Sequence, residues 1–453
     1  MMFQPTKRRC LWVASAAWLM VLSGIGGAPA EEAPAGWQAG VARRDITPSE
    51  AVPMWGYGAR RAAPSQGVLD PLLATALVLE SHGRKLAIVG LDLGRSPSEA
   101  SLNAIRTQIR EEAGIEASFI AGSHTHHGPV VELADRPGRG RGRFDATLRY
   151  QEHLQNQIVA AVLEADRNRR PARMAVGTEQ VEGLNRNRHG RVHPVPVDRD
   201  LSVMRFDDSE GKPIAVLVNF AAHPTLLKSS DLRFSAEYIG ALRQIVEREH
   251  GGLMLFMQGA SGDLSPAMEG RSGHVEYGEA LGREVVRIAG AISVREGAPA
   301  SMAFREEQVS FRPRIDMHNP LVRTALGMAF FPELIANYLD EYAEEVRPRL
   351  SVAMLDADVV IVGMSAEVFC AHAIRLKERA TVPHLFFAGM CNGYHQYLPT
   401  IEAVAEGGYG TDPPMAPAEV GAGERLADAA LMWIHAMQGK PPQSALQKML
   451  GLE

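Results

Sequence analysis

Cysteine is scarce in this sequence, with three residues in 453, at positions 10, 370 and 391. No C-x-x-C motif is present, which argues against a structural zinc knuckle. Cys370 and Cys391 are compatible either with a disulfide, in an oxidising compartment, or with two buried thiols. The cysteines therefore leave the redox state of the chain open.

A surplus of positive charge is also lacking. The formal net charge is −6, and no basic stripe is available to neutralise a phosphate backbone, which argues against nucleic acid as a partner. The one arginine-rich stretch is RPGRGRGR at Arg136–Arg143, which we interpret as a mobile loop near the functional site. Beyond the N-terminus, no apolar run reaches the roughly 20 residues that span a bilayer.

The first 30 residues have the pattern of a secretory signal peptide. Three basic residues, Lys7 to Arg9, precede an apolar run from Leu11 to Ile25, and Ala28-Pro29-Ala30 resembles a small-residue cleavage site. We expect residues 1–30 to be removed, and residues 31–453 to be exported to the periplasm or secreted. An uncleaved membrane anchor is the alternative.

The remaining chain reads as an α/β protein. Apolar strands alternate with helical segments, and the hydrophobic fraction of 46% supports a large core. We predict mixed β-sheets flanked by helices in a single large domain over residues 31–453. The clearest helices are Pro97–Ala113, with Ser96 as its N-cap, and Ala146–Arg169. Leu321–Val346 is predicted to be a largely helical insertion whose aromatic residues serve core packing, or, less commonly, line an apolar substrate site.

The stretch Ser123–Pro129 places three histidines within four residues, directly after an apolar run. A β-strand here would put His124 and His126 on one face, because side chains alternate along a strand. Both imidazoles could then lean toward one metal ion. The alternative is a polar loop without a metal. Gly128-Pro129 turns the chain away from this stretch.

Other apolar strands also end in residues capable of chemistry. His223, Ser265, Glu367 and Tyr397 each follow such a strand, and ligands bind at strand carboxyl ends in α/β sheets. A hydrolytic zinc site needs imidazoles, a carboxylate and one open position. His124, His223 and Glu367 supply that set, with His126 as a further ligand or as a residue beside the metal. A core histidine and a helix N-cap acid are the alternatives for His223 and Glu367.

Ser265 lies in the glycine-rich segment GASGDLSP. Its glycines permit a tight turn and expose backbone N–H groups, which suits a nucleophile or an oxyanion site. The segment is not a G-x-S-x-G elbow. Taken alone, a structural Asp-Ser turn is the simpler interpretation.

Taken in order, the motifs resemble one known family, the neutral or alkaline non-lysosomal ceramidases. The matching segments are ARRDITP…GYG, HTHHGP, NFAAHPT, GASGDLSP, SAEVF and NGYHQYLPT…GGY. They cover most of residues 31–453. The resemblance implies a zinc amide hydrolase that cleaves the N-acyl bond of ceramide or a related lipid into a fatty acid and an amine, and it leads us to expect transient contact with a membrane surface.

The resemblance also implies roles for individual residues. One zinc ion per chain would be held by His124, His223, Glu367 and Tyr397. The residue pattern by itself does not indicate Tyr397 as a ligand, so that assignment is implied by the resemblance only. His126 would lie beside the metal and move a proton or orient water. Ser265 would be a nucleophile or a positioning group. Arg186 and Tyr409 would hold the scissile amide or its product.

The chain departs from the family pattern in two respects. His127 stands where typical members have serine, and we expect it to face away from the site. We also expect the catalytic domain alone, without the C-terminal immunoglobulin-like domain of longer members. Both departures put ceramide as the substrate in question. The rival functions are a zinc esterase or amidase acting on small N-acyl substrates and a non-catalytic exported binding module.

Overall fold

The computed structural model describes residues 36–295, 300–328, 330–342 and 344–440. These residues belong to one compact unit. The expected signal peptide, residues 1–30, lies outside the described residues. Within the described part of the chain, no helix is long and apolar enough to cross a membrane.

Two mixed β-sheets form the centre of the fold. The larger sheet has, in spatial order, β11 (Leu253–Gln258), β9 (Pro213–Phe220), β8 (Asp200–Asp208), β6 (Arg170–Gln180), β1 (Trp37–Asp45), β3 (Leu73–Ser81), β4 (Arg84–Leu91) and β5 (Ala117–Gly122). The smaller sheet has β13 (Met302–Gln308), β14 (Arg349–Leu355), β15 (Val359–Met364) and β17 (His384–Ala388). The strand pairs β4–β5, β9–β11 and β15–β17 are parallel, and the other neighbours are antiparallel.

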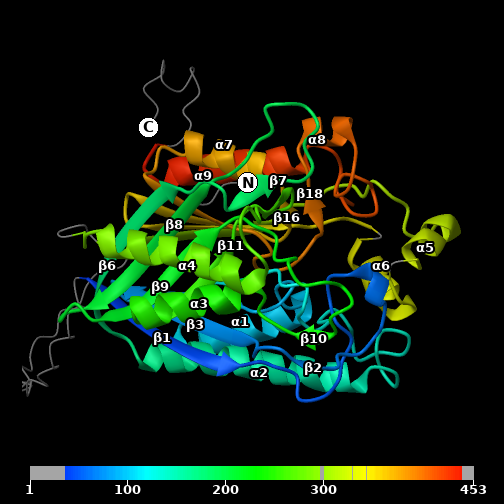
Figure 1. The fold of residues 1–453 in the computed structure, drawn as a ribbon, viewed down its shortest axis with the longest axis horizontal. Coiled ribbons are helices and arrows are strands. Elements are labelled where there is room, and N and C mark those ends of the chain that lie inside the picture. Colours follow the sequence, from blue (N-terminus) through cyan, green and yellow to red (C-terminus); the bar gives the residue numbers. More distant parts are fainter. Residues whose placement is uncertain (1–35, 296–299, 329, 343, 441–453) are drawn as a thin grey trace, which may run out of the picture. The chain divides into compact units, whose positions relative to one another are not determined.

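Helices cover the outer face of each sheet (Figure 1). The helices are α1 (Glu99–Ala113), α2 (Asp145–Arg167), α3 (Tyr238–Glu249), α4 (His274–Ala291), α5 (Pro320–Leu326), α6 (Pro332–Tyr342), α7 (Cys370–Arg379), α8 (Ile401–Glu406) and α9 (Ala422–Met437), with a 3-10 turn at Gly58–Arg60. Helices α1 to α4 pack on the larger sheet, and α6, α7 and α9 pack on the smaller one. A continuous apolar core fills the space between the two sheets. The predicted α/β class with mixed sheets is confirmed.

The predictions of the two clearest helices hold except at one N-terminus, whereas the predicted insertion Leu321–Val346 contains two separate helices, α5 and α6. Helix α1 begins at Glu99, and its N-cap is Ser98, whose hydroxyl accepts a hydrogen bond from the Ser101 N–H at 3.4 Å. The prediction of Ser96 was therefore wrong, because Pro97 and Ser98 remain extended and the first helical turn starts two residues later. Gly114 ends the helix in the left-handed conformation, as glycine does most readily.

Among the described residues, three two-stranded pairs lie outside the main sheets. They are β10 (Arg233–Phe234) with β2 (Gly67–Val68), β12 (Leu264–Pro266) with β7 (Asn185–Asn187), and β16 (Glu367–Val368) with β18 (Tyr397–Leu398). The last pair is parallel and sets Glu367 directly opposite Tyr397. Cys370 and Cys391 are buried free thiols, which excludes a disulfide between them in this structure.

Candidate metal site and cavity

His124 follows the end of β5 rather than lying within it. The strand ends at Gly122, and His124 has a φ of +69°, a conformation uncommon for a residue with a side chain. The strand prediction was therefore wrong at this residue, although its side chain still enters the site. Its N–H donates to the Leu93 carbonyl at 2.9 Å, and its ring Nδ1 lies 2.7 Å from the Gly94 carbonyl. A proton on Nδ1 leaves the Nε2 lone pair directed into the site.

The ring of His126 is held by the GYG segment. It packs edge-on against the rings of Trp55 and Tyr57, with centroids 5.3 and 4.9 Å away. Gly56 has a φ of +100°, and a Cβ there would lie 2.5 Å from the Cγ of His126. Only glycine tolerates both the backbone conformation and the close ring. The Nδ1 atom of His126 is buried without a partner among the described residues.

The glycine-rich segment that contains Ser265 supports His223. The Leu264 carbonyl accepts a hydrogen bond from the His223 N–H at 3.1 Å, and the Ser261 carbonyl lies 3.3 Å from its Nδ1. These contacts orient the ring so that its Nε2 faces the other two histidines. The segment therefore positions the His223 ring through its backbone carbonyl groups.

Glu367 and Tyr397 enter from the β16–β18 pair. The Glu367 N–H donates to the Gln396 carbonyl at 2.7 Å, and the Tyr394 hydroxyl donates to Oε1 of Glu367 at 2.5 Å. Oε2 of Glu367 lies 3.1 Å from Nε2 of His124. The carboxylate is thus held on one side by a buried phenol and directed on the other side toward the histidines.

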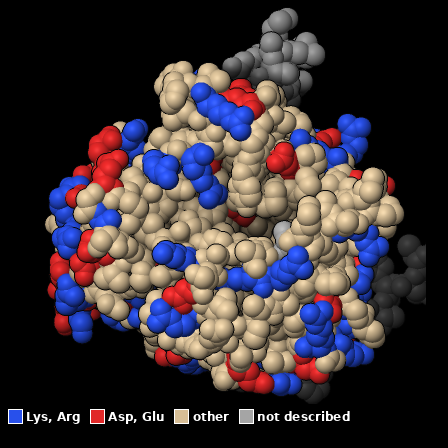
Figure 2. All heavy atoms as spheres, turned by 45° about the vertical axis from the view of Figure 1, so that its right-hand side comes forward, with Lys and Arg blue, Asp and Glu red and all other residues tan. Residues whose placement is uncertain are grey.

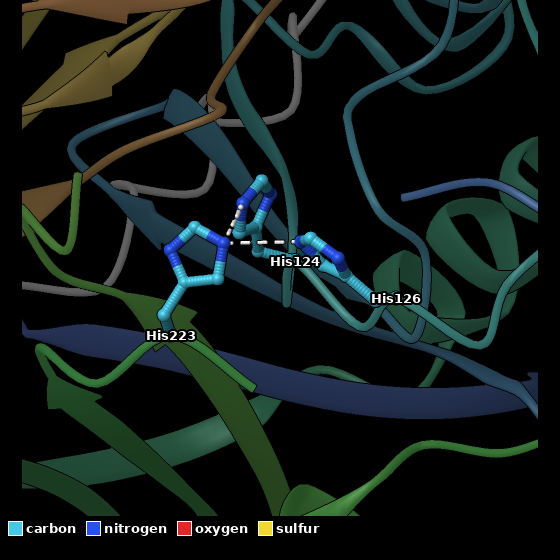
Figure 3. A group of neighbouring side chains, drawn as sticks. All are labelled: His124, His126 and His223. Atoms are coloured by element: carbon cyan, nitrogen blue, oxygen red, sulfur yellow. Dashed lines mark hydrogen bonds between the residues drawn. The ribbon is translucent and has the colours of Figure 1, made fainter. Parts of the chain in front are cut away.

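The side chains of His124, His126, His223 and Glu367 converge on one point. Nε2 of His223 lies 2.9 Å from Nε2 of His124 and 3.0 Å from Nε2 of His126, and Figure 3 shows the three rings meeting there. Nε2 of His223 is 3.9 Å from Oε2 of Glu367. Ligands about 2.0–2.1 Å from a tetrahedral zinc ion lie roughly 3.3 Å apart. The observed spacings bracket that value, so the donor set fits a metal of this size.

The electrostatics of the site favour metal ligation. Burial lowers the pKa of His126 and of His223 well below 6.5, with further lowering by neighbouring cations, so both rings are neutral at neutral pH. Burial raises the pKa of Glu367, but its interactions with His124 and hydrogen bonds from Tyr394 and Tyr397 outweigh this effect, so the pKa lies below 4.5. Neutral imidazoles beside an ionised carboxylate are the protonation states that zinc binding requires.

A largely apolar cavity of about 250 Å³ opens onto this cluster. His126, Glu367, Tyr397 and Tyr409 supply its polar wall. The apolar and aromatic lining residues are Met54, Trp55, Tyr57, Val130, Phe330, Phe331, Leu334, Tyr338, Tyr394 and Met415. Figure 2 shows the molecule hollowed on the face that carries α5 and α6. The aromatic residues of the insertion therefore pack in the core and also line the cavity. Lining an apolar site was the less common of their two predicted uses.

Two of the predicted site residues lie elsewhere. Ser265 is on β12, paired with Arg186 on β7, and neither is among the described residues that line the cavity. The side chain of Arg186 is exposed. Arg188, two residues along, instead approaches the site, with Nη2 3.3 Å from the Tyr397 hydroxyl and 2.9 Å from Nδ1 of His223. Arg188, rather than the predicted Arg186, is therefore the arginine of this motif that lies against the site.

Tyr409 lines the cavity, and His127 lies outside the histidine cluster. Tyr409 as a residue is 65% exposed, and its ring centroid is 5.7 Å from that of Tyr397. His127 faces away from the cluster, with Nε2 3.0 Å from Arg60 and Nδ1 3.1 Å from the Arg233 carbonyl. Its ring therefore belongs to a supporting contact rather than to the metal site.

Comparison with known proteins gives consistent matches. The family model described as "Neutral/alkaline non-lysosomal ceramidase, N-terminal" matches residues 37–279. "Neutral ceramidase B" of Dictyostelium discoideum is 24% identical over 263 residues, covering 52% of this chain and 36% of that protein. "Neutral ceramidase 1" of Arabidopsis thaliana is 26% identical over 231 residues, covering 46% and 28%. The alignments thus span only about a third of these relatives.

The fold also matches solved structures. The structure of neutral ceramidase from Pseudomonas aeruginosa superposes with a TM-score of 0.73 at 20% identity, covering 91% of this chain and 76% of that one. A structure described as "Ceramidase complexed with C2" gives a TM-score of 0.71 at 19% identity, with 91% and 77% covered. At this identity the match establishes a shared fold.

Proposed function

The chain belongs to the neutral/alkaline non-lysosomal ceramidase family, and on that premise we propose that it is an exported zinc-dependent amide hydrolase. Its proposed substrate is ceramide or a related N-acyl lipid, cleaved at the N-acyl bond into a fatty acid and an amine. The observation that carries this proposal is the convergence of three histidine Nε2 atoms and Glu367 beside a cavity with an apolar wall.

His124, His223 and Glu367 are the proposed metal ligands, with Tyr397, which lies opposite Glu367 in the β16–β18 pair, as the fourth. His126 belongs to the same histidine cluster and would lie beside the metal. When bound, zinc supplies Lewis-acid polarisation of the amide carbonyl and lowers the pKa of a water molecule to about 7. Oε2 of Glu367 is buried without a hydrogen-bond donor among the described residues, which is the state expected of an atom reserved for a metal. Burial and the neighbouring Glu367 raise the pKa of the Tyr397 hydroxyl, and Arg188 only partly offsets this, so Tyr397 is a neutral phenol at neutral pH.

His126 is the histidine best placed to act on substrate. It lines the cavity, whereas His124 and His223 lie behind it, and it is neutral at neutral pH. A neutral imidazole accepts a proton from the attacking water and returns it to the leaving amine as the C–N bond breaks. Proton transfer of this kind contributes typically 10²–10⁴-fold to the rate.

Arg188 and Tyr409 are proposed to hold the reacting amide. Arg188 lies against the Tyr397 hydroxyl and the Gly262 carbonyl, which fixes its guanidinium near the polar wall of the cavity. Tyr409 lines the same cavity. Donors positioned before the reaction stabilise negative charge that develops on the amide oxygen. The apolar lining is proposed to receive the acyl chain.

Hydrolysis of N-acyl sphingosines with graded acyl-chain lengths tests this proposal. We expect turnover to rise with chain length, to be lost on dialysis against a chelator, and to return on adding zinc. The His223→Ala variant should lose metal and activity together. Full activity in a metal-free His223→Ala protein would refute the mechanism, and turnover independent of chain length would favour small N-acyl substrates.

A further inference from the structure

Two consecutive arginines on the 3-10 turn beside the cavity have opposite surroundings. Arg60 is 6% exposed, and its guanidinium donates to the Ser229 carbonyl at 2.8 Å and to the Trp55 carbonyl at 3.2 Å. Arg61 is exposed, and its side chain has no hydrogen-bond or ion-pair partner among the described residues. Arg61 is nevertheless one of the residues that line the cavity. The turn therefore uses one arginine for its own structure and leaves the other available to a ligand.

The turn is held against the part of the cavity where His126 lies. Arg60 also donates to the backbone carbonyl of His126, and the ring of Tyr57, which precedes the turn, packs edge-on against the His126 ring with centroids 4.9 Å apart. Arg61 ends the turn with a φ of +50°, and its N–H donates to the Gly58 carbonyl at 3.0 Å. The backbone of Arg61 is thus fixed relative to His126, although its side chain reaches solvent.

The charge of the cavity lining distinguishes Arg61 from the other lining residues. Among the described residues, Arg61 and Glu367 are the only lining side chains with a full charge at neutral pH, because His126 is neutral. The Glu367 carboxylate points at the histidines and is a proposed metal ligand. A cationic group on a substrate would therefore find no free acid in the lining, whereas an anionic group would find Arg61. Figure 2 shows further Lys and Arg side chains beside and below the hollow.

We propose that Arg61 is a specificity-determining residue that binds an anionic group, a carboxylate or a phosphate, on the amine half of an N-acyl substrate. This inference rests on the proposed function, in which the apolar lining receives the acyl chain and leaves the amine half to the polar lining. A guanidinium binds carboxylate and phosphate through paired, charge-assisted hydrogen bonds that a neutral amino alcohol cannot supply. An N-acyl amino acid is the simplest such substrate. Its hydrolysis consumes one water molecule, breaks the C–N bond and releases a fatty acid and an amino acid.

Matched soluble substrates test the proposal. The value of kcat/KM is compared for N-octanoylglycine and N-octanoylglycinamide, which differ only in the carboxylate, and for O-phospho-N-octanoylethanolamine and N-octanoylethanolamine, which differ only in the phosphate. The octanoyl chain keeps the substrates dissolved, so no lipid surface takes part. We expect the wild type to favour at least one anionic substrate over its neutral partner by about five-fold, the size of an exposed ion pair, and less at high salt. The pair with the larger ratio identifies the anionic group.

Charge reversal at Arg61 should reverse this preference. We expect Arg61→Glu to favour the neutral substrate by a similar factor, so that the anionic-to-neutral ratio falls by roughly 25-fold. Arg110→Glu is the matched control, because Arg110 is an exposed arginine of α1 that does not line the cavity, and the change in net charge is the same. Its ratio should lie within about two-fold of the wild type. Equal ratios in the wild type and Arg61→Glu, or an equal fall in Arg110→Glu, would overturn the proposal.

The failure of this proposal can be told from failure of the proposed function. Turnover of the neutral substrates tests hydrolysis without any contribution from Arg61. If all the substrates are hydrolysed and the ratios do not depend on Arg61, the proposed function stands and the role of Arg61 is refuted. If none is hydrolysed, the proposed function fails, and calorimetry with the uncleaved substrates decides the role of Arg61. Tighter binding of an anionic substrate by the wild type than by Arg61→Glu would support that role, and equal binding would overturn it.

Discussion

The hydroxyl of Tyr394 is the contact whose loss best tests the metal site. It donates to Oε1 of Glu367 at 2.5 Å, and both side chains are buried. Tyr394→Phe removes this oxygen while keeping the ring, which packs edge-on against Trp55 and lies beneath the guanidinium of Arg95. The variant therefore changes one hydrogen bond to a proposed ligand with little change in packing.

The expected magnitude follows from the nature of that bond. A hydrogen bond to a charged group contributes about 1.5–3 kcal/mol, and a buried acceptor that loses its donor is not compensated by water. At about 1.4 kcal/mol per factor of ten, this predicts metal affinity weakened by roughly ten-fold to a hundred-fold or slightly more. Residues that orient a metal ligand by hydrogen bonding typically have effects of this size.

Competition with a fluorescent zinc chelator at neutral pH measures the affinity without requiring turnover. Tyr338→Phe is the matched control, because Tyr338 is a buried tyrosine in the same cavity that is not hydrogen-bonded to Glu367. We expect the control to bind zinc within about two-fold of the wild type. Wild-type affinity in Tyr394→Phe, or an equal loss in both variants, would refute the assigned role.

Three further predictions concern residues at different distances from the cluster. Arg188→Ala should lower kcat/KM by about 10²-fold, as removal of a charge-stabilising donor does, while Arg186→Ala should change it less than about two-fold. Ser265→Ala should retain activity within about ten-fold, and a loss near 10⁶-fold would restore Ser265 as the nucleophile. Burial raises the pKa of Glu237 from 4.5 to about 7, so its contribution to stability is complete below pH 4.5 and lost as pH rises through about 7. In the wild type, the unfolding free energy should therefore decline by about 3 kcal/mol as pH rises over this range, and Glu237→Gln should abolish the decline. Urea titration at a series of pH values measures it, and an unchanged pH profile in the variant would contradict the raised pKa of Glu237.

The fold class could be predicted because apolar strands and amphipathic helices alternate clearly along the chain. Helix α2 matches its predicted bounds within two residues at each end. The packing of the two sheets face to face could not be predicted, because both faces of strands such as β9 and β15 are buried and give no alternating pattern. Hydrophobicity indicates burial there without indicating which layer lies opposite.

The site was predicted in part. His124, His126, His223 and Glu367 meet as expected, since each follows an apolar strand whose end lies near the others. Arg188 was missed because β7 is three residues long and ends at Asn187, so side-chain alternation does not extend to it. Arg188 shares its motif with Arg186, and only the fold distinguishes them.

Tyr394 carried a signal that sequence reasoning did not use. It stands three residues before Tyr397 in NGYHQYLPT, and the parallel β16–β18 pairing brings that segment against Glu367. Pairing between two-residue strands cannot be inferred from a pattern of hydrophobic residues, because no periodicity develops over two positions. For the same reason, a role for Tyr397 beside Glu367 could be predicted only from the family resemblance.

Two buried asparagines explain how ligands from different sheets hold their spacing. Asn219 lies in the same motif as His223, and its side-chain amide exchanges hydrogen bonds with the backbone of Phe387 at 2.7 and 2.9 Å, which ties β9 to β17. Asn392 lies in the same motif as Tyr397, and its amide accepts from the Ile120 N–H at 2.9 Å, next to the end of β5. Each amide is buried, so an unpaired group would cost about 1–3 kcal/mol, and the two sheets cannot slide past each other without that loss. The motifs therefore carry both the proposed ligands and the buried amides that hold the two sheets in register.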